Sequence, residues 1–323
     1  MVLVDLPLAQ LREYRCPRPA PAGHAEFWDR TLAESRAAAG EIRCEPVGSG
    51  LTVVDAYDVT FPGFGGEEVR GWWLLPRGGS SQLPVVVEYL GYGGGRGLVH
   101  ERLTWAAHGF AQLVVDSRGQ GGVWNTGDTP DPHGSGPAGG GLLTRGVDHP
   151  DHLYYRRLLT DAVLAVDAAA RLPGADAGRI ATVGHSQGGA MALAAAALHP
   201  GVAATGARTP FLCGIARSLE VTDAVPYGDL AAYLGVHRTR AEEILTVLDF
   251  VDLTHLTPRI TCPTWVSVGL ADLVCPPSGI FGAVNAIEQV TPEVRTWSYN
   301  GHEAGGAHDD AHLADWLHQQ LPG

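Results

Sequence analysis

The stretch that decides the fold is Gly184-His185-Ser186-Gln187-Gly188, which reads G-x-S-x-G. The apolar run 179–183 before it is typical of a strand, and residues 189–198 after it are rich in alanine and leucine and favour a helix. A strand, a tight turn and a helix form the context that presents a serine as a nucleophile. The free N–H groups of the helix would face negative charge beside Ser186. The pattern predicts a nucleophile elbow; the alternative is a plain turn with an N-capping serine.

The rest of the chain alternates strand and helix patterns around this turn. The predicted strands are residues 51–60, 67–75, 84–90, 110–116, 179–183, 202–212, 264–270 and 294–299. The predicted helices are residues 25–39, 158–172, 189–198, 278–289 and 310–321. The first two strands are expected to form an antiparallel hairpin at a sheet edge. The others imply parallel βαβ units with right-handed crossovers.

These patterns predict an α/β protein with a mostly parallel central sheet flanked by helices. We expect one domain over residues 1–323, because no linker divides the chain. The domain would carry an N-terminal helical extension over about residues 1–50 and a small helical insertion over about residues 215–257.

Composition excludes several classes of function. The net charge of −13 argues against nucleic acid or an anionic membrane as a partner. The chain opens with no basic segment followed by an apolar run, and no apolar run is long enough to cross a bilayer. The five scattered cysteines fit neither a disulfide framework nor a zinc site, so a reduced, cytoplasmic setting is expected.

Two further residues complete a candidate catalytic set with the serine. Asp272 follows strand 264–270 and His302 follows strand 294–299, so both belong at the carboxyl edge of the sheet, where catalytic groups collect. The chain order serine, acid, histidine is that of α/β-hydrolases. Asp272 could instead be a turn or helix-capping aspartate, and His302 one of 14 histidines that lies in a loop. If Asp272 does not hold the histidine, Asp249 or Asp252 is the next candidate.

An acyl-transfer site also needs two backbone N–H groups to receive the oxyanion. Gln187, directly after the serine, offers one, and Tyr92, in the loop after strand 84–90, is expected to offer the other. Tyr92 could instead be a packing aromatic. Arg118 and Glu303 both follow strand ends, so we expect them to pair and steady the histidine loop, unless they are unrelated surface charges.

Two other motifs are weaker, and we predict neither a cofactor nor a metal. His308-Asp309-Asp310-Ala311-His312 offers metal-ligand types, but it begins the last helix, where acidic residues favour the helix dipole. The glycine-rich run 91–97 follows a strand but lacks the dinucleotide spacing and the acidic partner downstream.

Several motifs together resemble those of a known family. The chain resembles carbohydrate esterase family seven, the acetyl xylan esterases and cephalosporin C deacetylases, over about residues 5–320. The main motifs are Arg118-Gly119-Gln120, Gly184-His185-Ser186-Gln187-Gly188-Gly189 and His302-Glu303. Supporting matches are Gly91-Tyr92, Thr144-Arg145-Gly146, Tyr154-Tyr155-Arg156-Arg157, Pro210-Phe211-Leu212, and the segment from Ser267 through Asp272 to Ser278.

The resemblance implies an α/β-hydrolase that works as a serine esterase through an acyl-enzyme. The implied substrates are short acetylated xylo-oligosaccharides and the 3'-acetyl group of cephalosporin C. The enzyme would be cytoplasmic and a homo-oligomer, commonly a hexameric ring with inward-facing active sites. The implied site residues are the triad Ser186, Asp272 and His302, the oxyanion donors Tyr92 and Gln187, and the supporting residues Arg118, Gln120 and Glu303.

One position departs from the family pattern and bears on selectivity. His185 stands where members of that family often carry glycine, so it is expected to add bulk beside the nucleophile. With Pro210 and Phe211 it would form a stiff wall around the acyl group. A tight wall penalises extra methylenes, so acetyl esters should be favoured over butyryl esters by at least about tenfold.

The long glycine- and proline-rich loop 121–150 has no obvious role in the core of a monomer, and loops of this length are usually functional or form an interface. Because the resemblance implies a ring, we expect this loop to lie near a subunit contact. Three other functions remain open. They are a general short-chain carboxylesterase, a peptidase of the prolyl-oligopeptidase kind, and a catalytically silent binding protein with the same fold.

Overall fold

The central sheet is described here from a computed structural model that covers residues 5–38, 40–78, 82–134 and 139–322. Over these residues it has nine strands in the order β1-β2-β3-β5-β4-β6-β7-β8-β9. Ala39 at the end of a predicted helix and residues 135–138 of the predicted long loop lie outside the described residues. The strands are β1 (Arg43–Pro46), β2 (Val54–Pro62), β3 (Glu68–Pro76), β4 (Leu83–Tyr89), β5 (Ala111–Val115), β6 (Ala175–His185), β7 (Val202–Arg208), β8 (Thr264–Gly269) and β9 (Glu293–Trp297).

The sheet is antiparallel at one end and parallel over the rest. β1, β2, β3 and β5 pair antiparallel, whereas β5, β4, β6, β7, β8 and β9 pair parallel. The parallel part confirms the expected βαβ architecture. The predicted hairpin is present as β2 and β3, but its placement at the edge was wrong, because β1 pairs along the outer side of β2.

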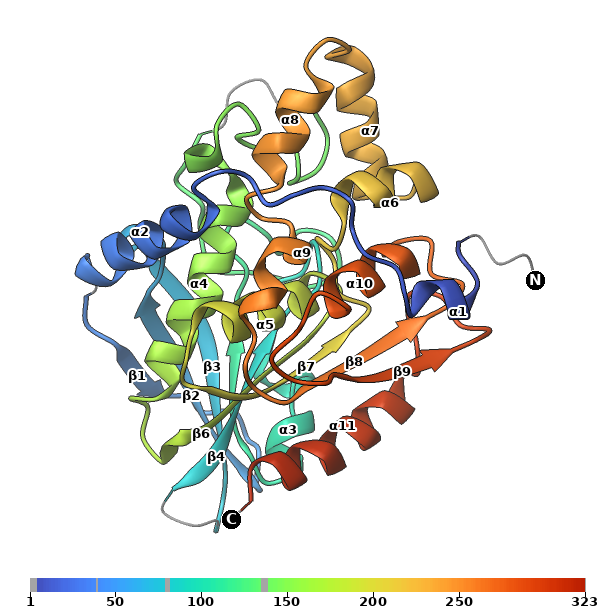
Figure 1. Cartoon of the computed structure of the whole chain (residues 1–323). Helices are drawn as coiled ribbons and strands as arrows, with labels where there is room; N and C mark the ends of the chain where they lie inside the picture. Colours follow the sequence, from blue (N-terminus) through green and yellow to red (C-terminus); the bar gives the residue numbers. More distant parts are fainter. Residues whose placement is uncertain (1–4, 39, 79–81, 135–138, 323) are drawn as a thin grey trace.

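Helices cover both faces of the sheet (Figure 1). One face packs against α4 (Tyr154–Ala169), α5 (Gln187–Leu198) and α10 (Pro277–Val284), and the other against α3 (Thr104–Ala107) and α11 (Ala307–Gln320). Every residue of α5 is buried, because its glycines and alanines allow the helix to lie close to β6 and β7. The elbow serine therefore sits between a buried strand and a buried helix.

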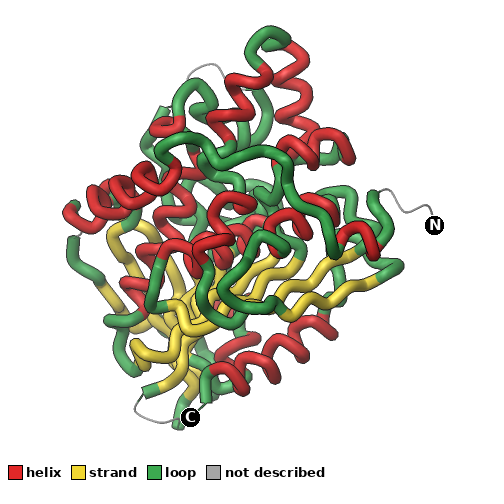
Figure 2. Tube along the Cα trace, in the orientation of Figure 1, coloured by secondary structure: helices red, strands yellow, loops and turns green. Residues whose placement is uncertain are grey.

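The remaining helices lie around this core, as the tube in Figure 2 shows. α1 (Leu8–Leu11) and α2 (His24–Ala37) belong to the N-terminal extension, and α2 packs on α4. The predicted insertion holds α6 (Ile215–Val221), α7 (Tyr227–Val236), α8 (Ala241–Leu248) and α9 (Leu253–Leu256). In Figure 1 the helices α6 to α8 rise above the layer formed by α4 and α5.

No helix within the described ranges is both long and apolar enough to span a bilayer.

Candidate active site

Ser186 occupies a sharp turn between the last residue of β6 and the first residue of α5. Its backbone has φ 58° and ψ −119°, which a residue with a side chain adopts only under strain. The Ser186 N–H donates to the carbonyl of Arg208 (2.9 Å), and its own carbonyl accepts from the Phe211 N–H (3.0 Å). These bonds to the end of β7 hold the strained turn in place.

The glycines on either side of the serine are required by close backbone approach. A Cβ on Gly184 would overlap the carbonyl group of Gly188, and a Cβ on Gly188 would overlap the carbonyl group of Tyr89 in β4. The G-x-S-x-G spacing is therefore set by sterics. It lets the start of α5 cross directly over the ends of β4 and β6.

Asp272 and His302 meet at the carboxyl edge of β8 and β9. The Nδ1 atom of His302 lies 2.9 Å from Oδ2 of Asp272. Asp272 is fully buried, and its Oδ1 accepts from the backbone N–H groups of Val274 (2.7 Å) and Cys275 (2.9 Å). Both carboxylate oxygens thus have donors, so the acid is fixed in orientation and Nδ1 of His302 carries the shared proton.

The two alternative acids have other partners. Asp249 pairs with Arg18 of the N-terminal segment at 2.8 Å. Asp252 caps α9 and accepts from the N–H groups of Gly214 (3.0 Å) and Ile215 (2.6 Å). Neither carboxylate is in the set of groups around His302.

The serine hydroxyl is not bonded to the histidine in this conformation. Across the part of the chain that the structure describes, no hydrogen bond joins Ser186 to His302. Burial raises the pKa of the Cys275 thiol, and the nearby Ser186 side chain opposes that rise. Nucleophile and base are often misaligned without substrate, and rotation about one side-chain bond would redirect the hydroxyl.

The expected oxyanion donors sit on two segments that one side chain ties together. Gln187 begins α5, and Tyr92 lies in the loop after β4. Oε1 of Gln120 accepts from the Gly93 N–H (2.6 Å), and its Nε2 donates to Oε1 of Gln187 (2.9 Å) and to the Tyr154 hydroxyl (2.7 Å). Gln120 therefore links the Tyr92 loop to the start of α5.

Tyr92 is held at both of its ends by the long loop after β5. Its backbone carbonyl accepts from the Trp124 indole N–H (2.7 Å), and its hydroxyl accepts from the Leu142 N–H (2.9 Å). The loop predicted as an interface segment thus also shapes the site. Sequence reasoning did not find Trp124.

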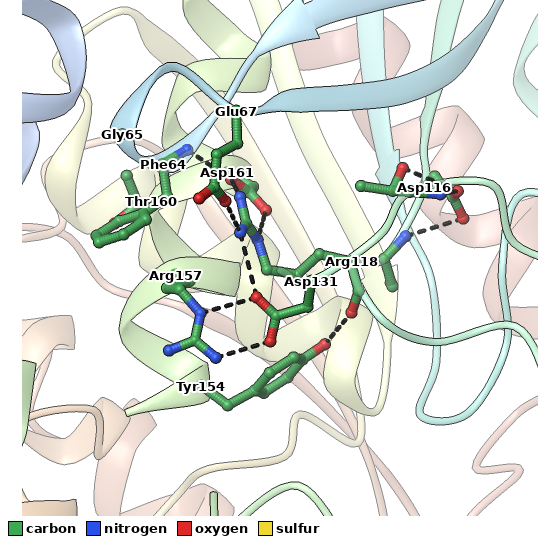
Figure 3. Close-up of polar contacts among 12 residues, drawn as sticks. Phe64, Gly65, Glu67, Asp116, Arg118, Asp131, Tyr154, Arg157, Thr160 and Asp161 are labelled. Carbon is green, nitrogen blue, oxygen red and sulfur yellow. Dashed lines mark hydrogen bonds and ion pairs between the residues drawn. The ribbon is translucent and has the colours of Figure 1, made fainter. Parts of the chain in front are cut away.

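The predicted pair between Arg118 and Glu303 is wrong. Arg118 is fully buried and faces Asp161 of α4, with Nε–Oδ2 2.5 Å and Nη2–Oδ1 2.7 Å. It also contacts Glu67 at 2.6 Å, as Figure 3 shows. Glu303 instead accepts from the side chain of Asn300 (3.0 Å). Both residues do follow strand ends, but Arg118 turns toward the buried side of α4.

The ion pairs of Arg118 and Arg157 form a charge network that fixes the loop after β5 to α4. Burial alone would lower the pKa of the Arg118 guanidinium. The carboxylates of Asp161 and Glu67 outweigh this effect, so the pKa is raised. Asp131, in the same loop, pairs with Arg157 of α4 at 2.7 Å (Figure 3). The Tyr154 hydroxyl donates to the Arg118 carbonyl (2.6 Å) and accepts from Gln120. The network therefore holds Gln120 in position through the Tyr154 hydroxyl.

Aromatic side chains form the wall beyond the serine. Phe211 is buried, and its ring meets those of Tyr227 at 5.0 Å, Tyr155 at 5.9 Å and Tyr92 at 6.5 Å. Pro210, just before it, is buried as well. His185, the third residue predicted for the acyl wall, contacts His302 through its Nε2 atom and its ring.

Candidate metal ligands are engaged with protein partners. In the weak motif at the start of α11, Asp309 accepts from the Ser267 hydroxyl (2.6 Å), and Asp310 pairs with Arg208 (2.6 Å). Within the described residues, the group that has metal-ligand spacing is formed by Glu67, Asp131 and His133, away from this motif. The guanidinium groups of Arg118 and Arg157 already neutralise its carboxylates, so a second cation would be repelled there.

A strained serine at a strand-to-helix turn, beside a histidine and an aspartate on the same rim of a mostly parallel sheet, defines an α/β-hydrolase. The comparisons with known proteins narrow this class. The family model for acetyl xylan esterase (AXE1) matches residues 1–320, so the chain belongs to this family of carboxylic ester hydrolases.

Similar solved structures extend over almost the whole chain. The acetyl xylan esterase from Paenibacillus sp. R4 is 33% identical, with a TM-score of 0.89 over 97% of this chain and 99% of that one. Acetyl xylan esterase 1 from Thermoanaerobacterium sp. JW/SL YS485 is 29% identical, with a TM-score of 0.90 over 99% of this chain and 100% of that one.

A curated relative is longer than this chain. The acetyl esterase Axe7A of Xylanibacter ruminicola is 26% identical over 292 residues, which is 86% of this chain. The match spans 64% of the length of that relative.

Proposed function

We propose that this protein is a serine esterase that removes acetyl groups from small acetylated substrates through an acyl-enzyme. The substrates would be acetylated xylo-oligosaccharides and related esters, including the 3'-acetyl group of cephalosporin C. The observation that carries the proposal is the hydrogen bond between His302 and buried Asp272, on the same sheet edge as strained Ser186.

In the first half of the reaction, neutral His302 takes the proton of the Ser186 hydroxyl as the oxygen attacks the acetyl carbonyl carbon. The carbonyl oxygen becomes an oxyanion, which accepts hydrogen bonds from the backbone N–H groups of Gln187 and Tyr92. The tetrahedral species collapses, and the bond to the leaving alcohol breaks. His302 returns its proton to that alcohol, which leaves Ser186 acetylated.

In the second half, water replaces the alcohol. His302 takes a proton from the water, whose oxygen attacks the acetyl carbon and forms a second oxyanion at the same two N–H groups. Collapse releases acetate and returns the proton to Ser186. Asp272 stabilises the imidazolium in both halves and keeps the proton on Nδ1, so that Nε2 is free to act as the base.

The acyl wall supports a preference for acetyl esters. Phe211, Tyr155 and Tyr227 are buried, with the Tyr155 ring edge to face against Phe211 and the Tyr227 ring tilted against it, so little free space remains for a longer chain. The names of the two similar solved structures, both acetyl xylan esterases, agree with this preference. The specificity constant for p-nitrophenyl esters should be highest for acetate and fall from butyrate to octanoate. A maximum at butyrate or beyond would indicate a general carboxylesterase.

The natural substrate needs a direct screen. Acetate release is measured over acetylated xylo-oligosaccharides, cephalosporin C and small aryl acetates, with Ser186→Ala as the matched control. Release from the sugars that depends on Ser186 supports the proposal. If acetate is released from aryl esters alone, the proposal that acetylated sugars are the substrates is wrong.

We further propose a cytoplasmic homo-oligomer, most simply a hexamer, with the loop 121–150 near a subunit contact. Two features support this proposal. Val123 and Trp124 of this loop are exposed (78% and 48%), which leaves apolar surface available to a neighbouring subunit. All five cysteines are free, as expected in a reducing compartment.

A further inference from the structure

His185 makes a contact that the proposed mechanism does not use. It is the last residue of β6, and its Nε2 lies 2.7 Å from the backbone carbonyl oxygen of His302. The two imidazole rings are 4.8 Å apart between centroids, with an interplanar angle of 43°. The residue before the nucleophile therefore touches the base at both its main chain and its ring.

The direction of this hydrogen bond fixes the chemical form of His185. A carbonyl oxygen only accepts, so Nε2 of His185 must carry a proton and donate it. Burial, and then the neighbouring His302, lower the pKa of His185 to about 4. The ring is therefore a neutral donor at neutral pH, and it places no second positive charge beside the imidazolium that forms during turnover.

Among the described residues, the side chains that bond to the main chain of His302 are those of His185 and Thr209. The Thr209 hydroxyl also donates to the His302 carbonyl, but at the longer distance of 3.3 Å. His185 also lines a cavity of about 130 Å³, together with Glu88, Trp124 and Arg208. Loss of the His185 ring would enlarge this cavity and would take from His302 both a hydrogen-bond donor and a ring contact.

We propose that His185 is a positioning residue for the proposed esterase reaction, holding the base His302 from its main-chain side. Asp272 fixes the imidazole at Nδ1, and His185 fixes the backbone that carries it. Together they set where Nε2 of His302 points. The inference rests on the proposed function, because it gives His185 a role in catalysis through His302.

The test compares two replacements of similar length. His185→Gln keeps an N–H donor near the position of Nε2, whereas His185→Met fills the space without a donor. The shorter amide of His185→Asn does not reach the His302 carbonyl and serves as a second donor-less variant if the methionine protein does not fold. His100→Met is the matched control, because His100 lies 2.8 Å from the Ser49 carbonyl on the exposed surface.

Each variant is assayed with p-nitrophenyl acetate and with a serine-directed phosphonate, at a temperature where all of them are folded. His185→Met should lower kcat and the phosphonylation rate by between about tenfold and a hundredfold, because the base is displaced, while KM changes less than about twofold. His185→Gln should stay within about threefold of the wild-type protein, as one retained donor implies. His100→Met should match the wild-type protein.

The possible failures have different signatures. If His185→Met and His185→Asn keep wild-type kcat, or if His185→Gln is as slow as His185→Met, the positioning role of the donor is refuted while the esterase assignment stands. A change confined to KM would make His185 part of the acyl wall and refute the inference in the same way. If wild-type hydrolysis equals that of Ser186→Ala, the proposed function fails and takes the inference with it.

Discussion

Among single residues, the geometry of the site depends most on Asp272, because both of its carboxylate oxygens have hydrogen-bond partners. Asp272 uses one oxygen for two backbone N–H groups and the other for His302. Such a carboxylate cannot rotate without losing hydrogen bonds in a buried place, which costs about 1–3 kcal/mol for each unsatisfied donor. The orientation of the histidine is therefore set before the substrate arrives.

Asp272→Asn is expected to abolish most activity and leave the fold intact. The amide keeps the shape of the side chain, but its NH₂ group must face either the backbone donors or Nδ1 of His302, which disturbs the tautomer that catalysis needs. The expected loss in kcat is on the order of 10⁴-fold. Acetate release and the melting temperature are measured on the same preparation. Wild-type kcat in the variant would show that another acid supports the base.

At the scale of elements, the apolar runs made the parallel strands predictable. β4 to β8 have buried apolar residues in short segments, β9 is half-buried, and all six strands were predicted. β1 was missed because three of its four residues are exposed and show no alternation. α4 begins at Tyr154, one turn before the predicted start. The prediction started too late because Arg156 and Arg157 look like surface residues in the sequence, whereas both are buried and form ion pairs.

The side chains that pair with each other were less predictable than the positions of helices and strands. The elbow, Asp272 and His302 follow strands that were identified, so their shared rim could be inferred from the sequence. The partner of Arg118 could not, because Asp161 lies 43 residues later in the chain on the buried side of α4. Which face a loop side chain turns to depends on strand order and helix placement. Local sequence patterns do not predict the antiparallel pairing of β3 with β5. They also do not predict that α4 lies over the loop that carries Arg118.

The buried network around Arg118 should matter far more for stability than an exposed ion pair does. Arg118→Met leaves Asp161 and Glu67 without their cation, and an uncompensated buried charge typically costs about 3–5 kcal/mol. Arg36→Met is the matched control, because Arg36 pairs with Asp167 at 2.8 Å on the surface and should cost about 1 kcal/mol or less. Urea unfolding compares the two variants. Equal losses would mean that the network is not a stabilising anchor.

The N-terminal extension should couple stability to pH through His24, the first residue of α2. Burial, and then His255, lower the pKa of His24 to about 4 from an ordinary value of 6.5. Between these values the unfolded chain binds a proton that the folded chain does not, so stability falls as pH is lowered through this window. Above it the effect is absent.

His24→Gln removes this proton uptake and is compared with the wild-type protein. The drop in melting temperature between about pH 7 and pH 4.5 should be smaller in the variant, because one group that protonates only on unfolding is gone. His185 titrates in the same direction and remains in both proteins, so part of the drop persists. An equal or larger drop in the variant would show that His24 is not a neutral buried group.

In the whole molecule, the loop after β5 both shapes the site and presents the proposed subunit contact. Asp131 anchors it to α4, and Trp124 reaches the carbonyl of Tyr92 while half its surface stays exposed. A subunit contact over Val123 and Trp124 would therefore lie next to the oxyanion loop, and assembly would bear on activity as well as stability.

The proposed assembly has a direct check in solution. Light scattering at micromolar concentration should give a mass of several chains, with six as the expected number. Trp124→Ser should lower this mass or weaken the assembly, because it removes exposed apolar surface from the loop. A wild-type monomer under these conditions would exclude the oligomer.

Mapping a serine-directed phosphonate tests whether Ser186 is the nucleophile of an acetyl esterase. Intact mass and peptide mapping should find one phosphonate per chain, attached to Ser186, and the loss of acetate release should follow the labelled fraction. Ser186→Ala should remain folded, take up no label and lose activity by several orders of magnitude, as for other triad serines. Full acetate release from fully labelled protein, or from Ser186→Ala, would contradict the account.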